Sequence, residues 1–386
     1  MRMTSRIFAS IGAIGVDFSS SGIRMLQLTQ RRGRLRVVGA AFVDMTDLSD
    51  DERSTKTLVD RLRSTLSTSG VAGRRCIVAP RRSDMLIQSV RMPQLPDNEL
   101  GQAVTWEAAE RFRVAREQLG VDCIRMGEIQ RGIESRDEVL IVACPRETLI
   151  SILEPLKSAG LRPIAVDTGF TALVRCHSMT CRRESDRSEV RALLEVGSSG
   201  SIFMVMHGDQ IALCKPIQVG GRDFDIAVAQ HLAIDLDVAR DLRSRRIMHR
   251  IHPNDRIEDD PEAVGTERAI YEAVRALMDQ IVKEVALCLR YYGVTFRGKP
   301  PARIVLAGGD ALEPRFDEML AQACKVSAVL DDPLSPVEDL FAEIAAAVGP
   351  TSGPPQSWAT VAGLSLRGMN LKAVRGNVAP ARKAAA

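Results

Sequence analysis

The chain has 386 residues, which is enough for two or more domains, with 45% hydrophobic and 26% charged residues. This balance is typical of a soluble globular protein, and no run approaches the roughly 20 apolar residues of a membrane-spanning helix. The net charge of +3 is too small to indicate a nucleic-acid-binding protein. The apolar stretch at residues 7–16 ends at Asp17 without a cleavage-site pattern, so we expect a cytoplasmic protein with reduced, scattered cysteines.

Residues 11–80 predict three strands, a helix at Lys56–Ser69 and a further strand at Cys76–Ala79. The first two strands are joined by residues 15–21, Gly-Val-Asp-Phe-Ser-Ser-Ser, in which an apolar strand ends in a carboxylate and small residues follow. Backbone N–H groups of such a loop can approach a phosphate closely, while the hydroxyls add donors and the carboxylate reaches a metal ion through water. Taken alone, a Gly/Ser loop between two strands is ordinarily a plain hairpin.

Residues 85–161 predict the order strand, helix, strand, strand, helix. Asp97 is the predicted N-cap of the first of these helices, which runs to about Arg113. The strand Glu138–Cys144 leads into the second helix. After it come a short strand that ends at Asp167 and a helix at Thr171–Thr180.

The loop pattern then occurs a second time, at residues 194–200, Leu-Glu-Val-Gly-Ser-Ser-Gly. An acidic residue again ends an apolar run, and a polar turn and a third strand-like run follow. Two such loops, one in each half of the chain, suggest a cleft that grips one polyphosphate from both sides. Gly220 and Gly221 start a helix whose N-terminal amides could also face phosphate, although capping the helix is an equal alternative. The basic run Arg240–Arg250 is expected to form a solvated helix face.

A third segment, residues 304–311, is a buried strand that runs into a glycine pair. Two glycines at the end of a strand let the backbone pass flat against a planar ligand such as a purine. Glu313 and Pro314 are predicted to open the next helix. Long and terminal helices are predicted at Glu267–Tyr292 and Trp358–Leu366.

Together the three segments have the order and spacing of the actin-like ATPase superfamily. Within it the chain resembles the type IV pilus assembly PilM family from about residue 14 to 367, with the cell-division protein FtsA as a more distant relative. The stretches that carry the resemblance are R-(L/M)-P…A-x-x-W-E-A at Arg91–Ala108, L-x-x-A-G-L-x-P-x-x-V-D at Glu154–Asp167 and G-G-x-x-(L/F) from Gly220. The resemblance implies an α/β fold of the actin-like (ribonuclease-H-like) type, with two duplicated lobes and a small subdomain inserted in the first.

The resemblance also implies roles for the residues that match the family's motifs. ATP with Mg²⁺ would bind between the loops, with Asp17 and Glu195 facing the metal and Asp167 positioning the attacking water. The residues expected around the nucleotide are Gly15, Ser19, Ser20, Ser21, Gly197, Ser198, Ser199, Gly220, Gly221, Arg243, Gly308, Gly309 and Asp310.

Three departures from the family pattern predict slow hydrolysis at most. Ser19 stands where the family usually has glycine. Glu195 replaces an aspartate, and its extra methylene moves the carboxylate by roughly 1.5 Å, whereas Mg²⁺ tolerates little deviation. Arg240 and Arg243 stand where the family has Ala-Glu-x-x-Lys, so that a carboxylate has become a cation. Such changes affect turnover before affinity.

These landmarks also predict the domain boundaries. The first lobe is assigned to residues 11–84 and 162–182, the inserted interaction subdomain to 85–161, the second lobe to 188–350, a helix returning to the first lobe to 356–367, and a disordered basic tail to 368–386.

The resemblance thus implies a cytoplasmic scaffold, peripheral to the inner membrane, of a type IV pilus or related secretion machine. Its expected partner is the cytoplasmic N-terminal segment of a PilN-type bitopic inner-membrane protein. This segment is expected to bind as an extended peptide in a groove where the insertion, with the helix around Trp106 and its strands, meets the first half. Pilus motor or platform proteins and self-association are compatible with the family, and nucleic acid is not expected. Two alternatives stay open: a small-molecule kinase of the same superfamily, for which the first half offers only Asp167 as a base, and a pseudo-ATPase scaffold that binds no nucleotide.

Overall fold

The computed structural model describes residues 10–19, 22–31, 34–45, 56–131, 134–179, 189–208, 210–251, 261–330, 334, 340–349, 353–367 and 369. The chain divides into two compact units. The first comprises Met1–Ala79, Pro155–Arg182 and Asp332–Ala386, and the second comprises Pro80–Glu154 and Arg183–Asp331. The basic tail predicted at 368–386 lies outside the described residues apart from Met369.

The first unit is built on a mixed sheet, in which β4 pairs with β3 and the other described strands follow the order β1-β3-β2-β5-β9. The strands are β1 (Ser10–Ile11), β2 (Ile14–Phe18), β3 (Gly22–Arg31), β4 (Arg34–Asp44), β5 (Arg75–Ala79) and β9 (Arg162–Val166). β2, β3 and β4 are antiparallel neighbours, whereas β5 is parallel to β2 and β9 is parallel to β5.

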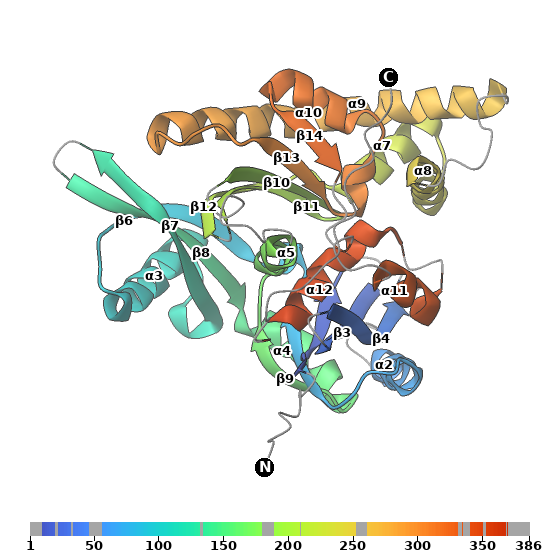
Figure 1. The fold of residues 1–386 in the computed structure, drawn as a ribbon, viewed down its shortest axis with the longest axis horizontal. Coiled ribbons are helices and arrows are strands. Elements are labelled where there is room, and N and C mark those ends of the chain that lie inside the picture. The colour runs from blue at the N-terminus through green and yellow to red at the C-terminus, as the bar shows by residue number, and fades with distance from the viewer. Residues whose placement is uncertain are drawn as a thin grey trace, which may run out of the picture. The chain divides into compact units, whose positions relative to one another are not determined.

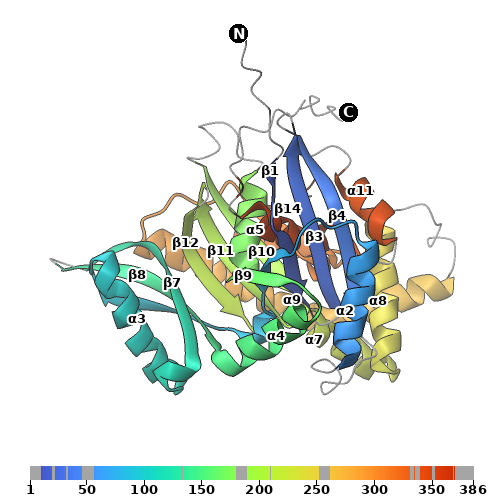
Figure 2. The ribbon, with the colours of Figure 1, turned by 90° about the horizontal axis from the view of Figure 1, so that it is seen from below.

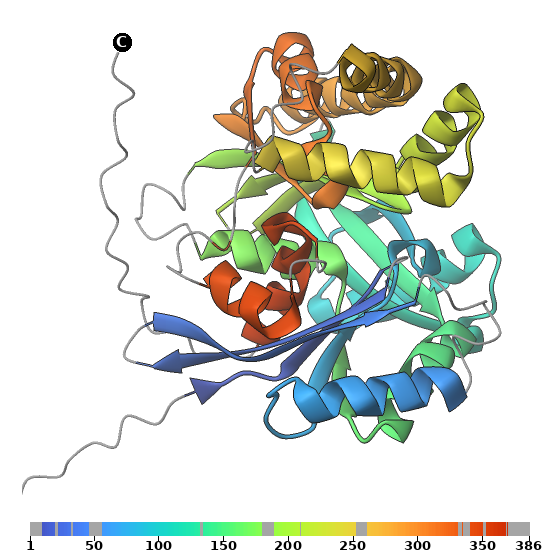
Figure 3. The ribbon, with the colours of Figure 1, turned by 90° about the vertical axis from the view of Figure 1, so that its right-hand side faces the viewer.

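Helices cover both faces of this sheet. They are α2 (Lys56–Thr68), α5 (Gly169–Ser178), α11 (Leu340–Val348) and α12 (Ala359–Leu366), with a short 3-10 turn η6 (Pro355–Trp358) before α12. Figure 3 shows the red helices of the C-terminal segment on one face of the blue strands and α2 on the other. Every residue of α12 is buried, and its Leu364 packs with Ile77, Ala79 and Ala172 in the core.

The second unit repeats this topology, except that β1 has no counterpart among its described strands. Its sheet has the order β12-β11-β10-β13-β14, which corresponds to β4-β3-β2-β5-β9. The strands are β10 (Val190–Gly197), β11 (Gly200–His207), β12 (Gln210–Ile217), β13 (Arg303–Ala307) and β14 (Ser327–Leu330). The first three are antiparallel, and β13 and β14 join in parallel, as in the first unit. The duplication predicted from the two loops is confirmed.

Four helices and a 3-10 turn accompany this sheet among the described residues. They are α7 (Gly221–Leu232), α8 (Leu236–Ile251), α9 (Pro261–Thr295), η4 (Gly309–Leu312) and α10 (Phe316–Cys324). Figure 1 shows α9 and α10 together on one face of the sheet. Side chains such as Phe224, Met278 and Phe316 join these helices to β10 and β11 in one core. β10 and β11 are almost wholly buried, which explains why they are continuous apolar runs in the sequence.

The second unit also contains a smaller layer of one helix on three strands. Its elements are η1 (Arg82–Asp84), β6 (Leu86–Pro93), α3 (Asp97–Phe112), η2 (Arg116–Gln118), β7 (Leu119–Arg131) and β8 (Glu134–Pro145), followed by α4 (Arg146–Ser158). α3 lies against the sheet β6-β8-β7 (Figure 2), where Val104 packs with Val139 and Ile141. The N-cap of α3 is Pro96, so the prediction of Asp97 at that position is wrong by one residue.

Contacts with β12 of the larger sheet and with α9 explain why this layer belongs to the second unit. Ser89 Oγ donates to the carbonyl oxygen of Cys214 (3.3 Å), and Arg91 Nη2 donates to the Tyr291 hydroxyl (2.8 Å). Its assignment to the first lobe as an insertion stays a prediction. In the part of the chain that the structure describes, each helix is either too short or too polar to span a lipid bilayer.

Candidate functional site

The first predicted phosphate loop follows β2. Ser19 Oγ donates to the carbonyl oxygen of Gly22 (2.8 Å) and accepts hydrogen bonds from Gly22 N (3.2 Å) and Arg24 Nη1 (3.3 Å). The Ser19 side chain therefore helps to close the turn between β2 and β3, at the position where the family pattern has glycine. Ser20 and Ser21 lie outside the described residues.

Gly15 lies in β2 and faces helix α12. A Cβ atom at this position would lie 2.3 Å from the carbonyl oxygen of Val361 and 3.0 Å from the Cβ of Leu364. Close packing of α12 on the sheet thus accounts for this glycine without a ligand. Its place beside a phosphate stays a prediction.

Asp17 pairs with Arg24 in the register of β2 and β3. Burial raises the pKa of Asp17 from its ordinary value of 3.8 to about 6, although the guanidinium of Arg24 opposes the shift. A carboxylate with a strongly shifted pKa is a candidate functional group. Because folding raises this pKa, ionisation of Asp17 lowers the free energy of unfolding. The contribution of Asp17 to stability is therefore fully present below about pH 4 and is lost as the pH rises through about 6.

Replacing Asp17 by Asn should therefore stabilise the protein at neutral pH. We expect the free energy of unfolding to rise by about 1–2 kcal/mol near pH 7.5 and this gain to vanish near pH 4. The gain is smaller than the full shift of the Asp17 pKa implies, because the side chain is partly exposed to solvent. Urea unfolding across this pH range measures the difference, with Asp60→Asn on the solvent side of α2 as the control. An Asn variant less stable than the wild type at pH 7.5 would show that the ionised Asp17 stabilises the fold.

Asp167, the predicted water-positioning residue, lies between β9 and α5. Its Oδ1 accepts hydrogen bonds from Thr168 N (2.8 Å) and Thr171 Oγ1 (2.6 Å). Its Oδ2 forms ion pairs with Arg175 (3.1 Å) and Arg367 (2.9 Å). The carboxylate thus holds the start of α5 through Oδ1, and through Oδ2 it joins α5 to the residue after α12. These contacts favour a structural role, and the catalytic role stays a prediction.

The second predicted phosphate loop is the turn between β10 and β11. Gly197 pairs with Gly200, so residues 198–199 form a two-residue turn. The first turn of α7 packs against this turn, and the backbone N–H of Arg222 donates to the carbonyl oxygen of Ser198 (2.9 Å). A Cβ atom at Gly220 would lie 2.2 Å from the backbone nitrogen of Gly200. The structure thus brings the second loop and the Gly-Gly helix start into contact, and this contact requires glycine at position 220.

A cation lies near Glu195, the predicted metal-facing residue on β10. The Nε of Arg82, from η1, would lie 3.2 Å from a Cβ atom at Gly200. Burial lowers the pKa of Arg82, and the Glu195 carboxylate opposes this shift. Nη1 of Arg82 is buried and has no hydrogen-bond partner among the described residues. A Mg²⁺ ion at Glu195 would therefore have to compete with a guanidinium that the sequence interpretation did not single out.

Arg243, on α8, lies in a buried ionic cluster. Its Nη1 donates to the carbonyl oxygen of Gly221 (2.9 Å) and to Asp225, and its Nη2 donates to Asp310 (3.1 Å) and Glu313 (3.0 Å). Burial by itself would lower the pKa of Arg243, but the carboxylates of Glu313, Asp310 and Asp225 raise it overall. The guanidinium is therefore held in its charged form by residues of α7 and of the segment after β13.

Arg246 extends the cluster by one helical turn. It donates to Glu313 and, through Nε, to Glu267 of α9 (2.6 Å). We call these six residues the Arg243 cluster: Asp225, Arg243, Arg246, Glu267, Asp310 and Glu313. The expectation that Arg240–Arg250 forms a solvated face is wrong for Arg243 and Arg246, which are buried, because carboxylates distant in the sequence lie opposite them.

The backbone of the glycine pair after β13 makes a close contact, as the sequence suggests, but the contact is with other protein residues and not with a purine. Gly308 has φ +86°, and a Cβ atom there would lie 2.4 Å from the carbonyl oxygen of Val196. Gly309 begins η4. The carboxylate of Asp310 lies directly over Gly221, where a Cβ atom would be 2.1–2.2 Å from its atoms. The predicted adenosine loop and the Gly-Gly helix start therefore meet through Asp310.

Comparison with known proteins places this arrangement in a family. The family described as type IV pilus assembly protein PilM matches residues 15–251, more than half of the chain. The chain belongs to the PilM family. Among solved structures it is similar to one described as the PilM–PilN type IV pilus biogenesis complex, with 19% identity and a TM-score of 0.70 over 94% of this chain and 99% of that chain.

Two further structures show a weaker likeness. The ethanolamine utilization protein EutJ from Carboxydothermus hydrogenoformans has 11% identity and a TM-score of 0.51, covering 92% of this chain and 89% of its own. The archaeal actin homologue Ta0583 has 12% identity and a TM-score of 0.43, covering 92% and 98%. The duplicated sheet topology and the likeness to the PilM–PilN structure confirm the predicted actin-like fold of this PilM-family chain.

The residues of the second unit fit a nucleotide only in part. A two-residue turn beside a helix start is an arrangement that binds phosphate in other proteins, but here the backbone N–H of Arg222 at the start of α7 already donates to the carbonyl oxygen of Ser198 (2.9 Å). The adenosine side does not fit. Asp310 fills the space over Gly221, and Arg243 is committed to four protein acceptors.

Of the six cluster residues, the sequence pattern indicated Arg243 and Asp310 but not Asp225, Arg246, Glu267 and Glu313. A signal for them does exist. Arginines at 243, 246 and 250 repeat at spacings of three and four residues, which places them on one helix face. That spacing does not reveal the carboxylates opposite them, which lie up to 70 residues away in the chain.

Proposed function

We propose that this PilM-family chain is an actin-like scaffold of a type IV pilus or related secretion machine. In this proposal it works in the cytoplasm at the inner membrane, where it binds the cytoplasmic N-terminal segment of a PilN-type bitopic protein. The observation that carries the proposal is a surface pocket at Trp106 in the second unit. This pocket combines an exposed aromatic side chain with an acidic rim.

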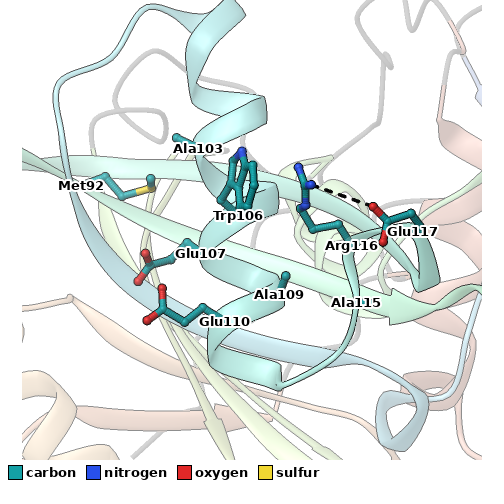
Figure 4. A pocket seen from close by; sticks show the side chains of 9 residues that line it. All are labelled: Met92, Ala103, Trp106, Glu107, Ala109, Glu110, Ala115, Arg116 and Glu117. Atoms are coloured by element: carbon teal, nitrogen blue, oxygen red, sulfur yellow. Dashed lines mark ion pairs between the residues drawn. The ribbon is translucent and has the colours of Figure 1, made fainter.

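The pocket has a volume of about 710 Å³ and lies between α3, β6 and the segment around η2. Its lining residues are Met92, Ala103, Trp106, Glu107, Ala109, Glu110, Ala115, Arg116 and Glu117 (Figure 4). Trp106 is 61% exposed, and the guanidinium of Arg116 lies 3.5 Å from the centre of its ring. Stacking of the guanidinium on the ring fixes the orientation of the exposed indole.

An exposed tryptophan of this kind is costly to leave in water and is typical of residues that dominate binding energy at interfaces. Methionine and alanine side chains supply an apolar floor beside it. Glu107, Glu110 and Glu117 also line the pocket (Figure 4). Glu107 is paired with Arg111 (2.6 Å) and Glu117 with Arg116 (4.0 Å), so the rim keeps a net negative charge through Glu110. The pocket therefore suits a segment that carries an apolar anchor together with basic residues.

The cytoplasmic segment of a bitopic inner-membrane protein has this chemistry. Cytoplasmic residues next to a transmembrane helix are enriched in lysine and arginine. Binding such a segment would bring the scaffold to the membrane surface, although no membrane-spanning helix is found among its described residues. Pilus motor or platform proteins and further copies of the chain would then be candidates for its other surfaces.

Titration of the labelled N-terminal segment of the PilN-type protein from the same source into the full chain tests this proposal. We expect micromolar binding that Trp106→Ala weakens by about 30-fold, as for an interface residue of high energetic weight. Ile150→Ala is the matched control, because Ile150 on α4 is 59% exposed but does not line the pocket, and it should leave binding unchanged. Equal affinity of Trp106→Ala and the wild type would contradict the pocket assignment.

ATP with Mg²⁺, expected from the family resemblance, is a second candidate ligand. The contact between the two-residue β10–β11 turn and the start of α7 supports it, whereas the Arg243 cluster opposes it. The small-molecule kinase has less support, because Asp167, the base it would need, is paired with two arginines.

A further inference from the structure

We infer that the Arg243 cluster takes the place of a nucleotide in the second unit, so that the unit keeps its arrangement without ATP and binds ATP weakly or not at all. The inference concerns a different part of the unit from the Trp106 pocket and does not depend on the partner.

The cluster joins segments that the sequence assigned to the nucleotide. Gly221 and Asp225 come from α7, Arg243 from α8, and Asp310 and Glu313 from η4 and the residue after it. A nucleotide would connect these segments by touching each of them. Here the guanidinium of Arg243 connects α7, η4 and Glu313 through its hydrogen bonds.

Space is the first reason why a nucleotide is excluded. The Asp310 carboxylate lies so close to the Cα of Gly221 that even a methyl group on that residue would collide with it. A ribose or purine entering between η4 and the start of α7 would have to displace this carboxylate. Displacement would remove one of the acceptors of Arg243.

Charge is the second reason. The cluster contains four carboxylates and two guanidinium groups, and a third guanidinium, that of Arg240, lies 3.6 Å from Asp225, so that a net negative charge remains. Like charges repel strongly where little water screens them, so the triphosphate of ATP gains nothing from approaching this cluster. Arg243 cannot turn to the ligand either, because Glu313, which has 0% exposure, would keep only one of its two guanidinium partners. Removing one partner from a buried ion pair is strongly unfavourable.

Thermal unfolding and calorimetry of the full chain with Mg-ATP test the inference. We expect the melting temperature to change by less than about 1 °C at about 5 mM Mg-ATP, because a Kd near 100 µM would already raise it by several degrees. A rise of several degrees that EDTA reverses, or a calorimetric Kd of about 100 µM or tighter, would overturn the inference.

A variant distinguishes exclusion of ATP by the Arg243 cluster from other causes of weak ATP binding. Asp310→Gly removes the carboxylate over Gly221 and should make the melting temperature sensitive to Mg-ATP. Asp310→Ser, which keeps an acceptor for Arg243 in a smaller volume, serves if the glycine variant does not fold. The matched control is Asp317→Asn. It removes the ion-pair partner of Arg250 (2.9 Å), which lies on α8 like Arg243, and its melting temperature should remain insensitive to Mg-ATP. A folded Asp310 variant as insensitive as the control would contradict exclusion by the cluster. Partner binding through Trp106 is read separately, so either proposal can fail alone.

Discussion

Replacing Arg243 by methionine should lower the free energy of unfolding by about 3–5 kcal/mol, which is typical of removing one partner from a buried ion pair. The side chain is only 3% exposed and holds the carboxylates of Asp225, Asp310 and Glu313 together. Methionine has a similar length but no charge, so these carboxylates would lose their shared counter-ion in a poorly solvated place. Urea unfolding followed by circular dichroism measures the change.

Arg245→Met is the matched control for this variant. Arg245 lies two residues along α8, is 76% exposed and pairs with Asp241 on the helix surface (2.6 Å). Exposed pairs of this kind contribute little, so we expect a change within about 0.5 kcal/mol. If Arg243→Met is as stable as this control, the cluster is not what holds α7, α8 and η4 together.

Gly363→Ala should destabilise the first unit by about 3 kcal/mol, at the upper end of the range for an overpacked core. Gly363 lies in α12, where a Cβ atom would be 1.8 Å from the carbonyl oxygen of Ala172 and 2.5 Å from its carbonyl carbon. Both atoms belong to the backbone of α5, so the methyl group can be accommodated only if one helix moves. Chemical unfolding of the purified variant measures the loss.

The control for this substitution is Gly101→Ala. Gly101 lies in α3, and a Cβ atom there would have no neighbour within 4 Å. Alanine in an open helical position should stabilise the protein by about 0.5–1 kcal/mol. Opposite signs for the two substitutions would show that contact with α5, and not helix propensity, decides the effect. An unchanged stability for Gly363→Ala would mean that α12 can move away from α5 at little cost.

Much of the fold follows from local patterns in the sequence. Helix α2 ends within one residue of its predicted bounds, because its apolar residues repeat with the helical period. The two strand-loop-strand copies predicted the duplication that the sheet orders confirm, because apolar runs and small turn residues act over short distances. The helix predicted to open at Glu313 begins instead at Phe316, after Arg315 at φ +70°.

The candidate site could be predicted less well, because it depends on contacts between distant residues. The sequence placed Arg243 near Gly221 and Asp310, and the structure brings these three together. It could not reveal that Asp310 fills the space over Gly221, or that Glu313 is buried against two arginines. The composition of a loop indicates what it can bind, whereas tertiary packing decides whether the space is already filled.

Binding of the PilN-type segment in the absence of nucleotide tests the central claim most directly. The labelled peptide is titrated into the wild-type chain in EDTA, and again in about 5 mM Mg-ATP, a concentration that would saturate a micromolar site. The account predicts micromolar affinity in EDTA, and a Kd that changes by less than about twofold on adding Mg-ATP, because ATP can alter this affinity only by coupling to it. Absence of binding in EDTA, with binding restored by Mg-ATP, would contradict it.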